Sequence, residues 1–186
     1  MKTRLIKSSL LFLIIFFPSL THAQLEKAEF QASGLTCSLC SNAINKALKT
    51  IPFIEAVNTD LNKNIFQITF KKNVIIDIDL IKKKVEDAGF SIAKFWIIEN
   101  LHDLKIENDQ HALIDGTYFH FMHVKSQTLN GENRLQIIDK DFVAAKEFKK
   151  YSAYTSMPCY QTGMMSDCCK SHGSRVSPAR IYHVTI

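Results

Sequence analysis

The chain has little that would tie it to a bilayer or to nucleic acid beyond its first residues. After residue 23, no apolar run is long enough to cross a membrane. No segment concentrates Lys and Arg enough to indicate nucleic-acid binding, and the three lysines at residues 82–84 are typical of the solvated face of a helix. The formal net charge of +5 falls to +2 without Lys2, Arg4 and Lys7. We therefore expect no nucleic-acid partner and no membrane span in the mature chain.

Residues 1–23 have the order of a secretory signal peptide. Three basic residues precede an apolar run at residues 10–17, which Pro18 ends, and residues 21–23 supply small side chains for cleavage. The run is short for a membrane span, although an uncleaved N-terminal anchor is the alternative. No Cys follows it directly, which argues against a lipid-modified N-terminus. We expect an exported protein, periplasmic or secreted, with a mature chain from about residue 24.

All 5 Cys lie after the expected cleavage site, where export would allow disulfides to form. Because five is odd, at least one thiol remains for an intermolecular bond, for a bound ligand or without either. Cys37 and Cys40 form a Cys-x-x-Cys pair, and the other three are Cys159, Cys168 and Cys169.

Residues 24–98 are predicted to form a domain with the ferredoxin-like order β-α-β-β-α-β. Alternation predicts strands at residues 29–32, 54–61, 65–70 and 91–98, and helical spacing predicts helices at residues 38–50 and 77–88. The expected inward residues are Leu39, Ala43, Ile44, Ala47 and Leu48 in the first helix and Ile78, Ile81 and Val85 in the second. The fold class is therefore α+β.

The pair Cys37 and Cys40 lies where the first strand meets the first helix. Residues three apart point to one side there, so both sulfurs can reach one ion. The unpaired N–H groups and positive dipole end of the helix favour thiolate over thiol. Two thiolates suit a soft ion, Cu(I) first, with Zn(II) or Hg(II) as competitors. Because two ligands leave the ion under-coordinated, an incoming thiolate has room to attack and remove it.

Residues 34–40, with the sequence Gly-Leu-Thr-Cys-Ser-Leu-Cys, resemble the metal-binding loop of the heavy-metal-associated domain family. That family includes copper chaperones, metal-pumping ATPases and mercury-binding proteins. Residues 87–90, Asp-Ala-Gly-Phe, resemble the exit of its second helix, and the resemblance covers about residues 26–98. It implies that Cys37 and Cys40 bind the metal, that Leu35 packs beneath the loop where the family usually has Met, and that Phe90 shields the sulfurs.

The same resemblance implies a metal-donor or metal-acceptor partner, such as a metal-transporting ATPase. Our leading hypothesis is a non-enzymatic Cu(I) chaperone or scavenger. A Cys-x-x-Cys at a strand-to-helix turn is also the thioredoxin pattern, but there Trp precedes the first Cys, whereas here Thr36 does and the single Trp is Trp96. A thiol-disulfide oxidoreductase and a metal-sensing protein-interaction module are the alternatives, and a Cys37–Cys40 disulfide would be a resting form.

Residues 99–186 are predicted to form a small second α+β domain, in which we recognise no family. Residues 99–110 are polar and indicate a linker or a solvated strand. The turn signal Asn130-Gly131 predicts a hairpin between strands at residues 117–125 and 134–138. Residues 139–141 can cap a helix at residues 142–151, which a final strand at residues 181–186 follows. The expected buried stripe of that helix is Phe142, Ala145, Phe148 and Tyr151.

Two features of this half suggest further sites. In a regular strand His120 and Met122 share one face and His123 takes the other, so we interpret the two histidines as one half-buried and one exposed residue. The loop at residues 157–172 is rich in Cys and Met, and it predicts either a second soft-metal site, since thiolate and thioether both select Cu(I), or a disulfide from Cys159 to Cys168 or Cys169. The candidate ligands are Met157, Cys159, Met164, Met165, Cys168, Cys169 and His172.

Overall fold

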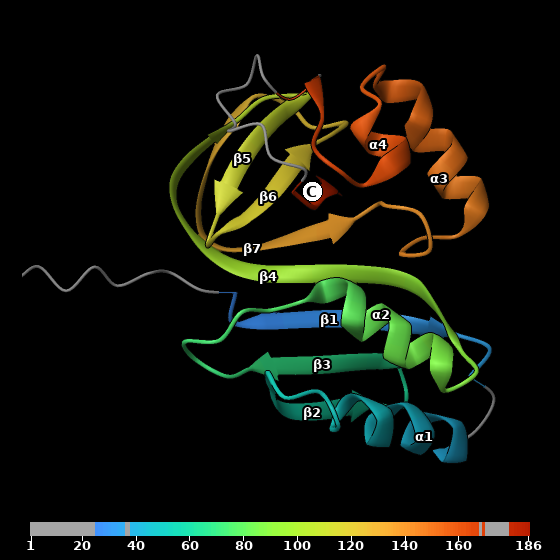
Figure 1. Cartoon of the computed structure of the whole chain (residues 1–186). Coiled ribbons are helices and arrows are strands. Elements are labelled where there is room, and N and C mark those ends of the chain that lie inside the picture. Colours follow the sequence, from blue (N-terminus) through green and yellow to red (C-terminus); the bar gives the residue numbers. More distant parts are fainter. Residues whose placement is uncertain (1–24, 36–37, 168, 170–178) are drawn as a thin grey trace, which may run out of the picture.

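A computed structural model of the chain describes residues 25–35, 38–167, 169 and 179–186. The strands are β1 Lys27–Ser33, β2 Ile54–Asp60, β3 Ile65–Phe70, β4 Ser91–Ile106, β5 Gln110–Ile114, β6 Thr117–Phe121, β7 Gln127–Ile137 and β8 Ile181–Thr185. The helices are α1 Ser38–Leu48, α2 Ile78–Asp87, α3 Ala145–Tyr151 and α4 Cys159–Thr162, with a 3-10 turn η1 at Ser152–Tyr154. Within the described ranges, the eight strands form one sheet in the order β2-β3-β1-β4-β7-β8-β6-β5 (Figure 1). No helix in those ranges has the length and apolarity to cross a membrane.

The first half has the predicted β-α-β-β-α-β order. β1 lies between β3 and β4 and runs antiparallel to both, and α1 and α2 lie on the same face of these strands (Figure 1). α2 buries the three predicted residues, Ile78, Ile81 and Val85, and the side chain of Asp77 caps its first turn by accepting from the Leu80 N–H. The ferredoxin-like prediction for this half is confirmed.

The inward face of α1 differs from the prediction at its start. Ile44 and Leu48 are buried as expected, but Leu39 is 77% exposed and Ser41 is buried in its place. At about 3.6 residues per turn, Leu39 lies nearly opposite Leu48 on the helix, whereas Ser41 lies close to the line through Ile44. Ala43 is also exposed. The expected inward position of Leu39 and Ala43 was therefore wrong, because their spacing fits the helical repeat only loosely.

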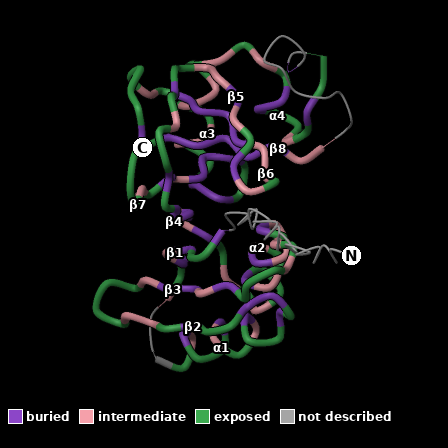
Figure 2. Tube along the Cα trace, turned by 90° about the vertical axis from the view of Figure 1, so that its left-hand side faces the viewer, coloured by how far each residue is buried: buried purple, intermediate pink, exposed green. Residues whose placement is uncertain are grey.

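The long strand β4 joins the two halves of the molecule. It pairs with β1 from Ser91 to Ile98 and with β7 from Phe95 to Ile106, so the expected boundary between residues 98 and 99 lies inside it. Figure 2 shows buried segments on both sides of this strand. The main core is also continuous, because Phe95 contacts Phe142 edge-on with ring centroids 5.5 Å apart. Of the two alternatives for residues 99–110, a strand is correct as far as Ile106.

The predicted hairpin at Asn130-Gly131 was wrong. β7 continues through both residues and pairs with β4 and β8, while β8 separates it from β6 and runs parallel to β6. Gly131 has φ +70, and the pairing of β4 with β7 shifts register between Leu101 and Leu104. The Asn130 side chain accepts from the Asp103 N–H at 2.8 Å. Asn130 and Gly131 therefore lie opposite a register shift in β4, and they do not reverse the chain.

The helix expected at residues 142–151 begins three residues later, at Ala145. Phe142 is fully buried in the main core ahead of the helix, and no residue of α3 is buried. The N-cap, Ala144, makes no side-chain capping bond. Asp139, expected to help cap this helix, instead pairs with His183 and Arg180, because a buried carboxylate requires charged or hydrogen-bonding partners.

Candidate metal centre

The loop between β1 and α1 carries the predicted metal ligands. Gly34 begins it with φ +79, a left-handed conformation that glycine adopts without strain. Thr36 and Cys37 lie outside the described residues, and Cys40 is the third residue of α1 and is half-buried. No acidic residue occupies the first turn of α1. Cys40 therefore lies at the positive end of the helix dipole, where no carboxylate of the same turn competes with its sulfur for a cation.

Leu35 and Phe90 lie at the same end of the sheet as this loop. Ser33 pairs with Ser91 at the end of the β1–β4 ladder, so Gly34 and Phe90 are the next residues beyond that pair. Phe90 is placed by the end of α2, where Gly89 has φ +88 and the Phe90 N–H donates to the Val85 carbonyl at 3.2 Å. Both Leu35 and Phe90 are partly buried against the main core. That Phe90 shields the sulfurs from water stays a prediction.

The Cys/Met-rich loop is divided between the interior and the surface. Cys159 begins α4 and forms a buried cluster with Met165, Cys169 and Ile181, on which the partly buried Met157 packs. Met164 is 37% exposed. Cys168 and His172 lie outside the described residues. The structure therefore brings four of the seven candidate residues, Met157, Cys159, Met165 and Cys169, into one cluster.

Three histidines stand side by side across β5, β6 and β8. His111 pairs with His120 in the β5–β6 ladder, and His120 pairs with His183 in the β6–β8 ladder. All three are buried, and their ring centroids lie 4.5 Å and 4.9 Å apart along the row. His120 is thus fully buried and not half-buried as expected, while His123 is exposed as expected.

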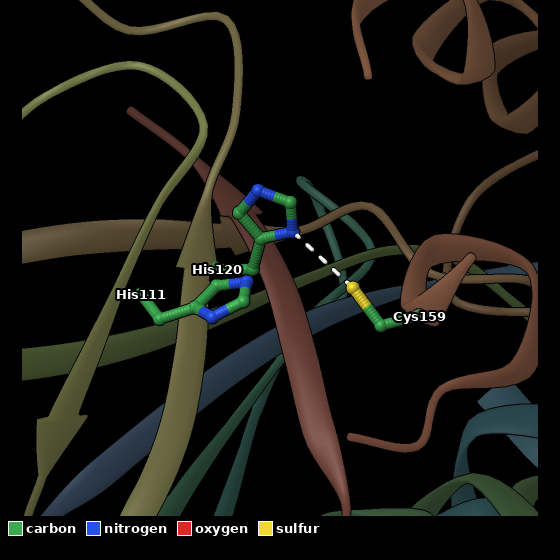
Figure 3. A group of neighbouring side chains, drawn as sticks. All are labelled: His111, His120 and Cys159. Carbon is green, nitrogen blue, oxygen red and sulfur yellow. Dashed lines mark hydrogen bonds between the residues drawn. The ribbon is translucent and has the colours of Figure 1, made fainter. Parts of the chain in front are cut away.

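Cys159 meets this row at its centre. Its Sγ lies 3.8 Å from Nδ1 of His120 (Figure 3). Atoms that can bind a metal on His111, His120 and Cys159 all lie within 4.8 Å of one another. Sequence reasoning named Cys159 but missed this grouping, because no local motif links His111, His120 and Cys159. The signal that could have found part of it is Asp115-Gly116, the two-residue turn of the β5–β6 hairpin that sets His111 opposite His120.

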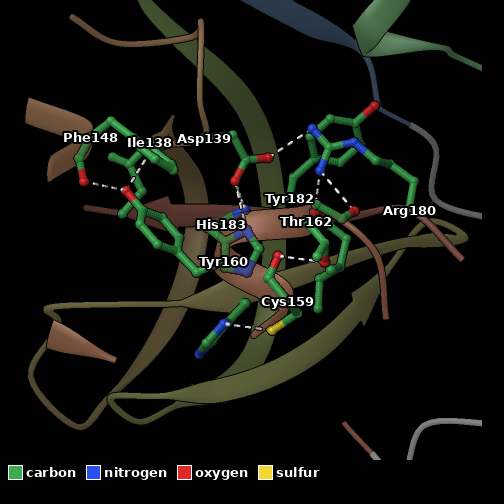
Figure 4. Close-up of polar contacts among 12 residues, drawn as sticks. Ile138, Asp139, Phe148, Cys159, Tyr160, Thr162, Arg180, Tyr182 and His183 are labelled. Atoms are coloured by element: carbon green, nitrogen blue, oxygen red, sulfur yellow. Dashed lines mark hydrogen bonds and ion pairs between the residues drawn. The ribbon is translucent and has the colours of Figure 1, made fainter. Parts of the chain in front are cut away.

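Two carboxylates fix the orientation of two of the rings. Nε2 of His120 donates to Oδ1 of Asp109 at 2.8 Å. Nδ1 of His183 donates to Oδ1 of Asp139 at 2.6 Å, as Figure 4 shows. Burial, followed by the charges of His183 and His111, lowers the pKa of His120 to about 3 against the opposing effect of Asp109. His120 is therefore a neutral imidazole near neutral pH, with its Nδ1 directed at Cys159.

Arg180 connects this region to α2 of the first half. Its guanidinium lies 2.7 Å from Oδ2 of Asp79 through Nε and 2.8 Å from Oδ2 of Asp139 through Nη2. Tyr182 donates to the same Asp79 carboxylate at 3.2 Å. Asp139 is nearly buried, and the guanidinium of Arg180 compensates its negative charge. The carboxylate of Asp139 also accepts from the ring of His183.

A β-α-β-β-α-β unit with a Cys-x-x-Cys between its first strand and first helix has the features of a small soft-metal-binding domain. The family model for the heavy-metal-associated domain matches residues 29–91. This segment of the chain belongs to that family.

Two curated relatives illustrate the match. The chain is 38% identical over 76 residues to the probable copper-transporting ATPase HMA5 of Arabidopsis thaliana, covering 41% of this chain and 7% of that protein. It is 27% identical over 59 residues to the copper chaperone CopZ of Staphylococcus haemolyticus, covering 32% of this chain and 85% of the chaperone. The chain thus spans only a small fraction of the ATPase relative and most of the length of the chaperone.

Solved structures of similar sequence cover a comparable share of the chain. The yeast copper transporter domain Ccc2a, solved in apo and Cu(I)-loaded states, is 30% identical, covers 42% of this chain and is itself covered to 99%, with a TM-score of 0.33. The copper-binding domain of the P-type ATPase HMA7 is 32% identical, with 36% of this chain and 92% of that chain covered and a TM-score of 0.32. The family assignment rests on the sequence match and not on these scores.

Proposed function

We propose that the heavy-metal-associated domain binds one Cu(I) ion between the thiolates of Cys37 and Cys40 and passes it to another protein by ligand exchange. The observation that carries the proposal is the family match over residues 29–91, with relatives named as copper-transporting ATPases and a copper chaperone. The position of Cys40 in the first turn of α1 adds support, because the residue is half-buried and no carboxylate of that turn competes with its sulfur for the ion.

Transfer requires that the ion be reachable and not fully coordinated. Two thiolates leave coordination positions open, so a thiolate of a partner can bind before one of the two original Cu–S bonds breaks. Next to Cys40, Leu39 exposes 77% of its surface. An exposed apolar side chain beside the ligand gives a partner an apolar contact while the sulfurs exchange.

The partner fits a metal donor or acceptor of the same family, such as a metal-transporting ATPase. The expected signal peptide would place this exchange outside the cytoplasm, where Cys37 and Cys40 must be kept reduced to bind Cu(I). Oxidation to a Cys37–Cys40 disulfide would remove both ligands. The domain would then act as a carrier only where a reductant or the bound ion protects the thiols.

A Cu(I) competition experiment tests this function. The reduced protein is titrated anaerobically with Cu(I) in the presence of a chromogenic Cu(I) chelator, and we expect it to take one ion at this loop. The double variant Cys37→Ser, Cys40→Ser should lose that binding, whereas Asn42→Ala, an exposed change on the same helix, should keep it. Retention of high-affinity binding by the double variant would rule the assignment out.

The oxidoreductase alternative predicts a different activity. A thioredoxin-like enzyme would reduce insulin catalytically with Cys37 and Cys40, whereas a metal carrier would not. We expect no turnover of insulin by the reduced protein under conditions in which thioredoxin is active. A rate that depends on both cysteines would instead favour the oxidoreductase.

A further inference from the structure

Outside the segment that matches the family, four side chains with metal-binding atoms converge in the interior. His111, His120 and His183 come from three neighbouring strands, and Cys159 comes from α4. None of the four exposes more than 7% of its surface. Polar side chains are costly to bury, so a row of three imidazoles beside a thiol requires a compensating interaction.

We propose that His111, His120 and Cys159 form a second metal site, which binds one zinc or copper ion independently of Cys37 and Cys40. The candidate ligand atoms lie within 4.8 Å of one another. With a metal–sulfur bond of about 2.3 Å and a metal–nitrogen bond of about 2.0 Å, an ion separates two ligands by roughly 3.5–3.7 Å in tetrahedral to trigonal geometry. The distance of 3.8 Å between Sγ of Cys159 and Nδ1 of His120 is close to that value.

The hydrogen bond between His120 and Asp109 prepares His120 for this role. Because the carboxylate accepts the proton of Nε2, the lone pair of the neutral ring lies on Nδ1, which faces Cys159 (Figure 3). Metal-binding histidines in proteins usually donate their other N–H to a carboxylate or carbonyl, which fixes the tautomer and the ring orientation. The thiol of Cys159 releases its proton to the solvent as its sulfur binds the ion.

His183 supplies a second, independent indication of a ligand. Asp139 accepts from its Nδ1, whereas the buried Nε2 atom has no hydrogen-bond partner among the described residues. His183 lies next to His120 in the row. A buried nitrogen without a partner costs free energy, and a ligand bound beside the row would offer it one.

The donor set indicates the kind of metal. Two imidazoles and one thiolate suit zinc and copper, whereas magnesium and calcium require oxygen ligands. Met165, Cys169 and Ile181 pack with Cys159 in one buried cluster, and none of these side chains offers the oxygen ligands that a hard cation requires. Because the ligands come from β5, β6 and α4, a bound ion would link three separate segments of the second half.

The chain Cys159–His120–Asp109 also has the order of a cysteine nucleophile, its base and an orienting carboxylate. Cys159 and His120 are both fully buried, so a substrate carbonyl has no access to the sulfur. A nucleophilic role also gives no reason for the two further histidines beside His120. The metal site accounts for His111 and His120 as ligands and for the burial of Cys159.

The test uses the Cys37→Ser, Cys40→Ser variant, in which the loop site is removed and the buried site is intact. Co(II) serves as a visible probe for zinc, and Zn(II) and Cu(I) are titrated separately, each with equilibrium dialysis and metal analysis. We expect one equivalent of Co(II) with thiolate-to-cobalt charge-transfer absorption, displaced by Zn(II) or Cu(I). Adding Cys159→Ser should abolish the charge-transfer band, and adding His120→Gln should weaken binding at least tenfold.

The matched control is His102→Gln in the same background, since His102 is exposed and lies outside the cluster. It should bind as the parent does. Circular dichroism and thermal melts check that each variant is folded, and a metal-dependent rise in Tm of the parent, absent from the Cys159 variant, gives a second readout. No binding of any of the three ions to the folded parent, or full binding without Cys159, would overturn the proposal. Because the parent lacks Cys37 and Cys40, this result is independent of the proposed loop function.

Discussion

The two candidate sites differ in almost every physical respect. The loop site includes Cys40 at the start of α1, next to the exposed Leu39. The second site offers two nitrogens and one sulfur in the interior of the other half, from β5, β6 and α4. Few ligands and good access favour exchange of an ion, while several ligands from separate strands favour its retention. The loop site thus suits an ion that is passed on, and the buried site suits an ion that stays bound.

The largest expected effect is a difference in exchange rate between the two sites. When protein loaded with Cu(I) is mixed with excess chelator, we expect the loop ion to leave by direct attack on the open coordination positions. An ion at His111, His120 and Cys159 should leave more slowly by orders of magnitude, because the chelator reaches it only when the buried cluster opens. Stopped-flow absorbance measures both phases. The Cys37→Ser, Cys40→Ser variant should lack only the fast phase and Cys159→Ser only the slow phase, and equal rates would break the comparison.

The second effect concerns the charges that support each region. Arg180→Ala removes the partner of Asp139, which is nearly buried, and should lower the free energy of unfolding by about 3–5 kcal/mol. Arg134→Ala is the matched control, since Arg134 is 45% exposed in its pair with Glu29, and it should cost no more than about 1 kcal/mol. Urea denaturation measures both. An equal loss of unfolding free energy in the two variants would show that Arg180 contributes no more than a surface residue does.

A smaller effect separates ligation from orientation at the second site. Asp109→Asn keeps the shape of the side chain and tolerates the φ of +63 at this position, but it weakens the hold on Nε2 of His120. We expect metal affinity of the buried site to fall about 10–100-fold while the loop site is unaffected. Titration with Co(II) in the double-serine background gives the first value and Cu(I) competition in the otherwise unchanged protein gives the second. An unchanged Co(II) affinity would mean that Asp109 has no part in the site.

The sequence was informative about the loop site and nearly silent about the buried one, for a physical reason. The two candidate ligands of the loop are three residues apart in the sequence, so a local motif can point to them. His111 and His120 pair across the β5–β6 hairpin, but Cys159 is 39 residues from His120 in the sequence and meets it only in the folded chain. Long-range strand order has no signature in a local pattern, and the turn signal at Asn130-Gly131 pointed to the wrong neighbour.

Predictions from local patterns also failed at the start of α1 and at Asp139. Helical periodicity identified Ile44 and Leu48 but included Leu39, since an apolar residue near a helix end fits a repeat without being buried. Asp139 had the right position for a cap, yet burial beside Arg180 and His183 gave it stronger partners. Local preferences were overruled in both cases by contacts from other parts of the chain.

The last prediction concerns Glu99, which lies on β4 where the two regions join. Burial, followed by hydrogen bonding with Asp115 and by the charges of Asp115 and Glu26, raises its pKa from 4.5 to about 8. Burial also raises the pKa of Asp115. Between pH 4.5 and pH 8 the folded chain therefore holds a proton on Glu99 that the unfolded chain has lost, so stability falls as pH rises through this window.

One proton corresponds to a slope of at most about 1.4 kcal/mol per pH unit. Glu99→Gln should flatten this slope, because the amide cannot ionise. The free energy of unfolding of the variant should therefore compare more favourably with that of the unchanged protein at pH 8 than at pH 4.5. Glu55→Gln, an exposed change on β2, is the control and should leave the slope unchanged. Urea denaturation at a series of pH values measures the slope. Glu26 precedes β1 in the first half of the chain, and Asp115 follows β5 in the second half. A single cooperative transition at every pH would show that the two halves unfold together. A second transition above pH 8 would show that ionisation of Glu99 separates them.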